Sequence, residues 1–369
     1  MKKCFIFAVF FLCVCMMGCE KKQNNNNITY SENNYGSEST VTPKDNNVKS
    51  DDMNINEEID TNLSVQAKMQ MPTKKLSVYS SALKQFDYDK VQSILWPDAE
   101  DKDVTVDEFG SRYYREASFG GEKGSFIYRK NDYVDYIDTL CSYAKETKLK
   151  MEKHLKFGTR EDVKDRAEKL LAKFNVGCEL DEPYIVALNS KDLSEIQKKI
   201  VKDDNYKDIL AAKNLGNSSF EKEMEIYYLE YSFVLDDIHV FGYEDPTVQY
   251  SGDNPLIGHN MRMTVIFSKS GIERFSLEGV LNVLKKESKN VELIGYEGIK
   301  KALRKRFGDV ILTEPYKVTN IWMEYFPLIR KDSFDQVDVV PVWCCDFEIN
   351  GEVANYTLRF HAVTGEEIS

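Results

Sequence analysis

Histidine is scarce in this 369-residue sequence, and the four that occur do not form a motif. His154, His239, His259 and His361 fall on different predicted elements, without HExxH or any other paired spacing. Lone histidines are usually packing or surface residues. We therefore expect no metal site and no catalytic histidine.

Other signatures of chemistry are also missing. The sequence has no GxSxG stretch, no glycine-rich phosphate loop and no CxxC pair. It therefore lacks the motifs that usually supply acyl transfer, nucleotide chemistry and a cysteine-bound zinc. Acidic pairs such as Glu244-Asp245 lie in predicted loops, where solvated acids are common. We expect a protein that is not an enzyme and that holds no cofactor.

Cysteine is present but sparse after the N-terminal region. Cys19 is followed only by Cys141, Cys178, Cys344 and Cys345. In an exported protein a disulfide such as Cys141 to Cys178 is one option, and buried free thiols are the other. Cys344 and Cys345 are adjacent on a predicted strand, so their side chains should face opposite ways.

A long apolar run occurs at only one place, the N-terminus. Lys2 and Lys3 form a positive region, and residues 4–17 are apolar but too short to cross a bilayer as an ordinary transmembrane helix. Met16-Met17-Gly18-Cys19 then resembles a bacterial lipobox. We predict that residues 1–18 are a lipoprotein signal peptide and that Cys19 is alkylated by a diacylglyceryl group, whose two acyl chains, such as palmitate, anchor the protein. Cleavage elsewhere and an uncleaved anchor are the alternatives.

Residues 19–70 are rich in asparagine, serine and acids, as in KKQNNNNITYSENNYGSEST. Such a composition buries too little apolar surface to offset its ordering entropy, so it predicts a disordered tether. A flexible chain of this length has an end-to-end distance of about 35 to 40 Å. The alternative is an adhesive segment that orders on a partner.

The remaining residues, about 300 in number, are too many for one small core, and their patterning predicts an α+β fold of helices packed on antiparallel sheets. We expect a smaller N-terminal stretch (71–158) and two similar modules (159–290 and 291–369). The clearest helix begins at Thr159, where Asp162 completes a capping box, and is expected to end at Gly177. Short stretches predict a helix over 77–86, a hairpin turning at Asp236-Asp237, and a turn at Asn350-Gly351.

The C-terminal strands read IWMEYFPLI, VVPVWCCDFEI and LRFHAVTGEEI. Pro341-Val342-Trp343 and the later Ala362, Thr364, Gly365 and Glu366 resemble the last module of YycI-like and PepSY-like extracytoplasmic proteins. With the lipobox, the helix after Thr159 and the GIERFSL strand, the chain is similar to uncharacterised Gram-positive lipoproteins. That resemblance implies contact with an envelope protein such as a sensor, without catalysis, and it carries over no catalytic residue. We also expect Pro341 at a strand start or edge, and Trp343 in the core against its helix.

The net charge of the chain also limits the kinds of partner that we expect. The formal net charge is −12, and about −14 after loss of Lys2 and Lys3, so nucleic acid is not an expected partner. One stretch, residues 300–306, is strongly basic. If this stretch is helical, Ile299, Leu303 and Phe307 point inward and the charged side chains point outward. The charged face is then either simply solvated or a contact for a cell-wall polyanion or an acidic partner.

These observations predict a lipid-anchored protein on the outer face of the cell membrane. We expect a non-enzymatic binding or regulatory accessory of the cell envelope. A solute-binding lipoprotein is the alternative, disfavoured because no alternating strand and helix pattern of two parallel lobes is seen, and a cell-wall hydrolase is the third option.

Overall fold

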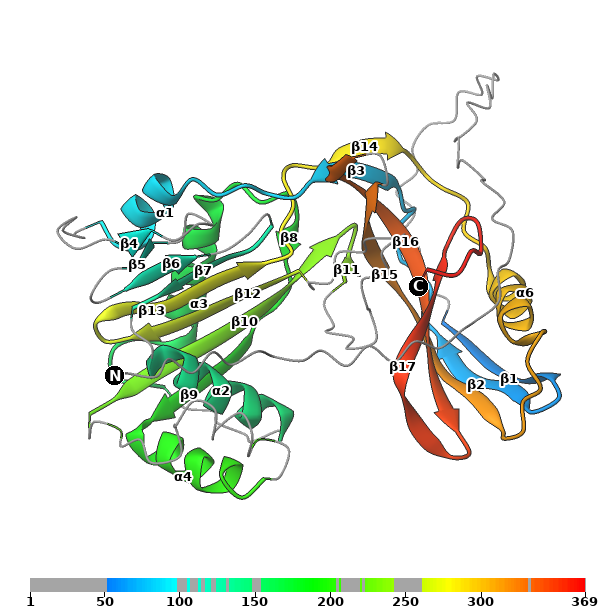
Figure 1. The fold of residues 1–369 in the computed structure, drawn as a ribbon, viewed down its shortest axis with the longest axis horizontal. Coiled ribbons are helices and arrows are strands. Elements are labelled where there is room, and N and C mark those ends of the chain that lie inside the picture. Colours follow the sequence, from blue (N-terminus) through cyan, green and yellow to red (C-terminus); the bar gives the residue numbers. More distant parts are fainter. Residues whose placement is uncertain are drawn as a thin grey trace, which may run out of the picture. The chain divides into compact units, whose positions relative to one another are not determined.

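The protein has an α+β fold in the computed structural model (Figure 1). The described residues are 52–97, 105–106, 112–113, 117–120, 124–130, 133–147, 154–203, 206, 220, 223–241, 261–330 and 333–368. The predicted signal peptide, Cys19, His259 and Glu244-Asp245 lie outside them, as does part of the predicted tether.

The first sheet is antiparallel throughout. Its strands follow the order β4 (Thr105–Val106), β5 (Arg112–Tyr113), β6 (Ser118–Gly120), β7 (Phe126–Arg129), β13 (Gly271–Glu278), β12 (Arg262–Ser268), β10 (Glu225–Leu235) and β9 (Tyr184–Asn189). Strands distant in sequence, such as β7 and β13, are therefore neighbours in the sheet.

Helices cover both faces of this first sheet. On β10, Ile226 and Tyr228 belong to the cluster beneath α2 (Tyr133–Glu146) and α4 (Ser190–Ile200). The intervening Tyr227 and Leu229 belong to the large cluster that includes α3 (Arg160–Ala172) and α1 (Tyr88–Leu95). Because successive side chains of a strand point to opposite faces, β10 contributes to two separate hydrophobic cores.

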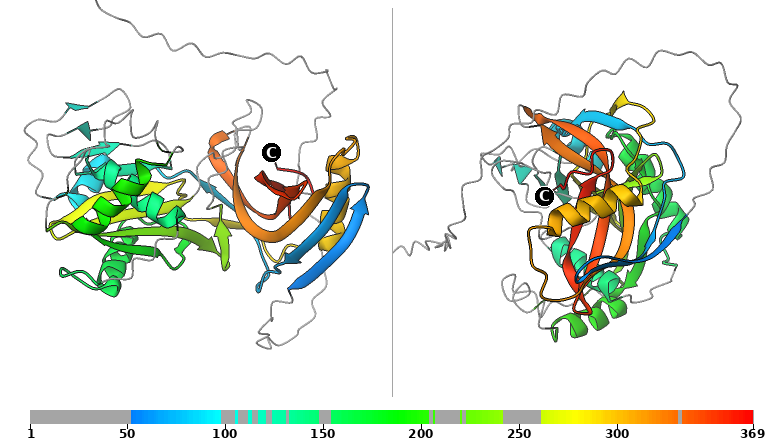
Figure 2. Two further views of the ribbon diagram at one scale, coloured as in Figure 1. Left: turned by 90° about the horizontal axis from the view of Figure 1, so that it is seen from below. Right: turned by 90° about the vertical axis from the view of Figure 1, so that its right-hand side faces the viewer.

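The second sheet is built on a long hairpin of β15 (Tyr316–Arg330) and β16 (Ser333–Ile349). Its other strands are β1 (Met53–Asp60), β2 (Leu63–Met69), β3 (Val78–Ala82), β8 (Glu179–Leu180), β11 (Ile238–Val240), β14 (Lys285–Ser288) and β17 (Glu352–His361). Helix α6 (Tyr296–Phe307) packs on one face through Ile299 and Leu303, which are fully buried. Figure 2 shows α6 beside β1 and β2 in both views.

The long hairpin changes its outer partners midway along its length. β15 pairs in parallel with β2 up to Ile321 and with β11 at Tyr325, while β16 pairs with β3 up to Val339 and with β17 from Val342. We call this level of the hairpin the waist. Pro341 lies there, inside β16 and not at a strand start, because its missing N–H falls where one partner strand has ended and the next begins.

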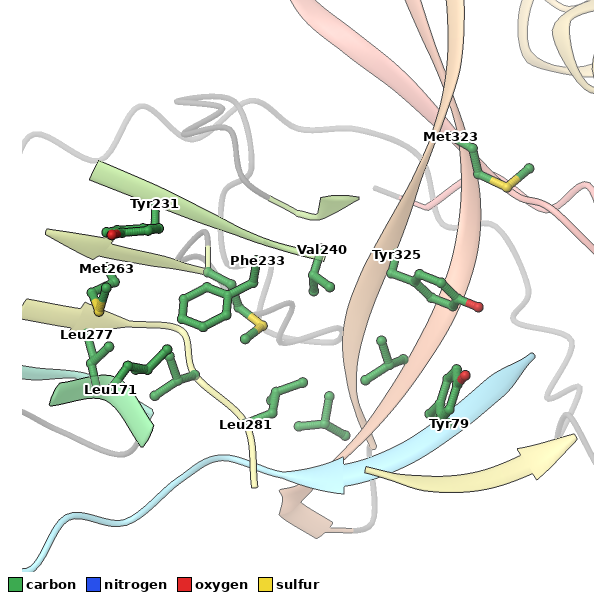
Figure 3. Packing of buried hydrophobic residues seen from close by; sticks show 14 of the residues in the cluster. Tyr79, Leu171, Tyr231, Phe233, Val240, Met263, Leu277, Leu281, Met323 and Tyr325 are labelled. Carbon is green, nitrogen blue, oxygen red and sulfur yellow. The ribbon is translucent and has the colours of Figure 1, made fainter. Parts of the chain in front are cut away.

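A single apolar cluster continues from the first sheet to the long hairpin. It contains Phe233 of β10, Val240 of β11 and Tyr325 of β15, with Leu281 and Tyr79 beside them (Figure 3). The hairpin of β10 and β11 supplies this continuity, since β10 pairs with β12 in its first part and with β11 in its last.

The predicted tether is wrong for residues 53–69, which form β1 and β2. An alternation of buried residues, Ile55 and Ile59 on β1 and Val65, Ala67 and Met69 on β2, is present within the polar composition. The β2–β15 pairing also shows that the C-terminal sheet is not confined to residues 291–369.

Two local predictions also differ from the structure. Residues 78–82 form β3, not a helix, because β3 pairs with β16 and β14. Helix α3 ends at Ala172, before Gly177. At Gly177 a Cβ would lie only 2.0 Å from the Asn282 carbonyl oxygen, so that glycine allows a close backbone approach.

Several local predictions are confirmed. Thr159 and Asp162 form the reciprocal capping box of α3. Asp236 and Asp237 both have positive φ, as do Asn350 and Gly351, which fits the two-residue turns of right-twisted hairpins.

Candidate functional site

The predicted lipidation residue Cys19 lies outside the described residues, so its modification stays a prediction. No helix within the described ranges is long and apolar enough to span a bilayer. Among the same residues, no group of three or more histidine, cysteine or acidic side chains could hold a metal ion.

The four described cysteines are free thiols. Cys141 lies in the cluster under α2, whereas Cys178 packs against the cluster on the other face of the sheet, so the two are not bonded. Cys344 and Cys345 point to opposite faces, as predicted. Burial raises the pKa of the thiols of Cys141, Cys344 and Cys345, which disfavours the nucleophilic thiolate.

The three described histidines do not come together. His154 is exposed, and Nε2 of His239 lies 3.4 Å from the Asp181 carboxylate. Nδ1 of His361 accepts hydrogen bonds from the backbone N–H groups of Val363 and Thr364, and burial lowers the pKa of this histidine.

The structure brings ionisable side chains together on the face of the waist opposite α6. Strand register places Trp322 opposite Cys344 and Cys344 opposite Arg359, so all three share one face. Glu324 lies two residues after Trp322 on that face. We call Trp322, Glu324, Cys344 and Arg359 the waist cluster.

Glu324 is the electrostatic centre of the waist cluster. It is 8% exposed, and its burial raises the pKa of the carboxyl group, against the hydrogen bond that Trp322 Nε1 donates at 3.1 Å and the positive charge of Arg359. A carboxyl group buried beside one specific cation is a common feature of functional sites, although structural networks show it too.

Arg359 is held between aromatic rings. Its guanidinium carbon lies 5.4 Å from the ring centroid of Phe241 and 5.6 Å from that of Phe326, distances suited to cation–π attraction. Its Nη1 donates to the carbonyl of Thr357 at 3.3 Å. These contacts hold the buried guanidinium of Arg359 in a fixed orientation.

The waist cluster was missed in the sequence because its members are far apart in the chain. One signal was present: Glu324 in IWMEYFPLI and Arg359 in LRFHA are lone charges within apolar strands. A charge at such a position is costly to bury unless it has a partner. Register, which places these strands side by side, was the missing information.

A second ionic cluster fastens α2 to the first sheet. Asp135 of α2 contacts Arg274 of β13 and accepts a hydrogen bond from Arg129 Nε at 2.8 Å. Nη2 of Arg274 lies 3.4 Å from Asp138, and burial raises the pKa of that carboxyl group. These contacts join α2 to β7 and β13, so we interpret the cluster as a structural attachment.

The predicted inward face of the basic stretch is confirmed, since Ile299 and Leu303 are fully buried and Phe307 packs against the same cluster. Trp343 is likewise fully buried, and its Nε1 donates to the carbonyl of Ile294, just before α6, at 3.0 Å.

These observations define a class: an α+β protein with two antiparallel-rich sheets and a buried ionic cluster at the waist of the second. No protein-family model and no curated protein matches the sequence. The fold is similar to that of an uncharacterized protein from Eubacterium rectale ATCC 33656, with a TM-score of 0.52 and 14% identity over 86% of this chain and 93% of that chain.

A second solved structure, YycH from Bacillus subtilis, matches with a TM-score of 0.31 and 11% identity, over 78% of this chain and 53% of that one. A score this low carries no argument about fold or function. The YycI-like and PepSY-like resemblance therefore stays a prediction from the C-terminal residues.

Proposed function

We propose that this protein is a lipid-anchored accessory on the outer face of the membrane, which binds a partner at the cell envelope and catalyses no reaction. The observation that carries the proposal is the order of the first nineteen residues. A positive region, a short apolar run and Met16-Met17-Gly18 lead directly to Cys19. The two acyl chains of a diacylglyceryl group on that cysteine give a stable anchor.

The proposed lack of catalysis is supported by the burial and the contacts of the potentially reactive side chains. The thiols of Cys344 and Cys345 are fully buried with raised pKa values, so neither is poised as a nucleophile. Glu324 is held by Trp322 and lies beside Arg359, an arrangement that orients groups without supplying a nucleophile and base pair.

The alternative of a two-lobed solute-binding protein is less well supported. Strand pairs within the described ranges are antiparallel except where β15 meets β2 and β11. The lobes of an alternating strand and helix protein need parallel sheets with crossover helices. A partner protein is therefore the better-supported ligand.

The experiment uses the mature chain with Cys19→Ser, so that the protein can be purified without detergent. It is immobilised and exposed to detergent-solubilised envelope, with competition by free mature chain. The proposal expects saturable, competed binding of a membrane protein, whose affinity is then measured with that partner purified. In parallel the chain is incubated with isolated wall material, and release of soluble wall fragments would overturn the non-enzymatic assignment.

A further inference from the structure

The basic stretch of α6 is a local concentration of positive charge on an acidic protein. Five of the seven residues from Lys300 to Arg306 are basic, while the whole chain has a formal net charge of −12. The structure separates these bases into those that hold the fold together and those that face outward.

Two of the five are engaged in ion pairs within the protein. Lys300 contacts Glu57 of β1, and its side chain is 13% exposed. Nε of Arg306 lies 3.0 Å from Oε1 of Glu367. These pairs attach α6 to β1 and to the C-terminal segment, and they leave little net charge.

The other three bases face outward. Lys301, Arg304 and Lys305 are exposed, and no ion pair joins them to a described residue. Arg304 donates through Nε to the carbonyl of Ile59 at 3.1 Å, which fixes the stem of its side chain while the guanidinium keeps its charge. The one acid on the helix is Glu297.

The position of α6 in the chain limits how far these bases can lie from the predicted lipid on Cys19. α6 packs on β1, the strand at which the chain coming from Cys19 enters the second sheet, and Tyr296 also donates to Glu57 of that strand at 3.0 Å. About 34 residues separate Cys19 from Met53, so the lipid and the start of β1 lie at most about 120 Å apart.

We propose that Lys301, Arg304 and Lys305 dock the folded unit onto anionic phospholipid headgroups of the same membrane that holds the Cys19 lipid. Basic residues near an anionic bilayer are attracted to it individually, and the effect falls off within a Debye length. The docking is therefore local to α6 and compatible with a negative protein. The identity of the membrane rests on the proposed lipid anchor. The binding of anionic lipid by this face of α6 does not depend on that anchor.

The test measures binding of the unlipidated mature chain, carrying Cys19→Ser, to vesicles by flotation. Vesicles of phosphatidylcholine with 30% phosphatidylglycerol are compared with vesicles of pure phosphatidylcholine, at low and high salt. The α6 variant is Lys301→Glu with Lys305→Glu. The matched control is Lys198→Glu with Lys199→Glu, two exposed lysines in the last turn of α4 that undergo the same change in charge.

The proposal expects salt-sensitive binding to the anionic vesicles only. Binding should fall at least ~10-fold in the α6 variant and less than ~3-fold in the α4 control, since each lysine near the surface contributes separately. Circular dichroism and the melting temperature check that both variants fold. Absence of binding to the anionic vesicles, an equal fall in both variants, or tighter α6-dependent binding to soluble polyglycerol phosphate would each overturn it. None of these outcomes depends on lipidation of Cys19, so a failure here is distinguishable from failure of the anchor.

Discussion

The phenol of Tyr325 donates a hydrogen bond to Oδ2 of Asp236 across 2.9 Å, which joins the long β15–β16 hairpin to the turn between β10 and β11. Tyr79 of β3 donates to the same oxygen at 2.7 Å. Tyr325 also contacts the backbone of Ser77, whose N–H donates to the phenol oxygen. One carboxylate thus connects β3 and β15 to the turn between β10 and β11. Burial together with this carboxylate raises the pKa of both phenols.

The first prediction concerns Asp236→Gly. Hydrogen bonds to a charged group contribute about 1.5 to 3 kcal/mol each, and relief of the positive φ at Asp236 offsets about 1 kcal/mol. Loss of both hydrogen bonds is therefore expected to lower the free energy of unfolding by about 2 to 5 kcal/mol, measured by urea denaturation. An unchanged midpoint would mean that the shared carboxylate does not stabilise the junction.

The neighbouring residue should behave in the opposite way. Asp237 also has positive φ, and among the described residues its carboxylate forms a surface ion pair with Lys74 at 2.6 Å. Exposed ion pairs contribute little, and glycine adopts this conformation without strain. We expect Asp237→Gly to raise the stability by about 0.5 kcal/mol. Asp237→Ala is the control, because it removes the same ion pair and keeps the strain, and it should be less stable than Asp237→Gly.

The capping box of α3 gives a third prediction. The Thr159 hydroxyl accepts from the N–H of Asp162, and a substitution to alanine at such a position typically costs about 1 kcal/mol. Thr159→Ala should lower the stability by that amount, while Thr159→Ser, which keeps the hydroxyl, should lower it by much less. Equal losses in the two variants would point to the methyl group and not to the cap.

His361 makes stability depend on pH. Its pKa is lowered in the folded state, mainly by burial and against the charge of Glu366, whereas an unfolded chain titrates near 6.5. The unfolded state therefore binds the proton first as the pH falls, so this contribution to stability is complete above about pH 6.5 and is lost below it. Urea midpoints at pH 7.5 and 5.0 should show a larger drop for the wild type than for His361→Asn, in which Oδ1 can replace Nδ1 as acceptor. If the two drops were equal, His361 would not be the titrating group.

The periodic segments could be predicted from the sequence. Thr159 and Asp162 identify a helix start because a capping box is local, and Asn350-Gly351 identifies a turn because glycine and asparagine tolerate positive φ. The strands of the long hairpin were likewise visible as alternating aromatic runs. These features depend only on residues close together in the chain.

What could not be predicted depends on contacts between distant segments. Residues 53–69 have the composition of a tether, yet β2 pairs with β15 and β1 packs against α6, so tertiary partners decide their structure. Pro341 is tolerated inside β16 only because the partner strand changes there. The charge of Arg359 acts on Glu324 for the same reason, because the register that brings their strands together cannot be read from either strand alone.

The anchor is the central claim, and Cys19→Ala tests it most directly. Cells producing the wild type, Cys19→Ala or the control Cys178→Ala are fed an alkyne-bearing fatty acid, and membrane and medium are compared for label and protein. The account predicts that the wild type and Cys178→Ala are labelled and remain with the membrane, while Cys19→Ala is unlabelled and is either released or retained unprocessed. Fatty-acid labelling of Cys19→Ala with normal processing and unchanged membrane retention would contradict it.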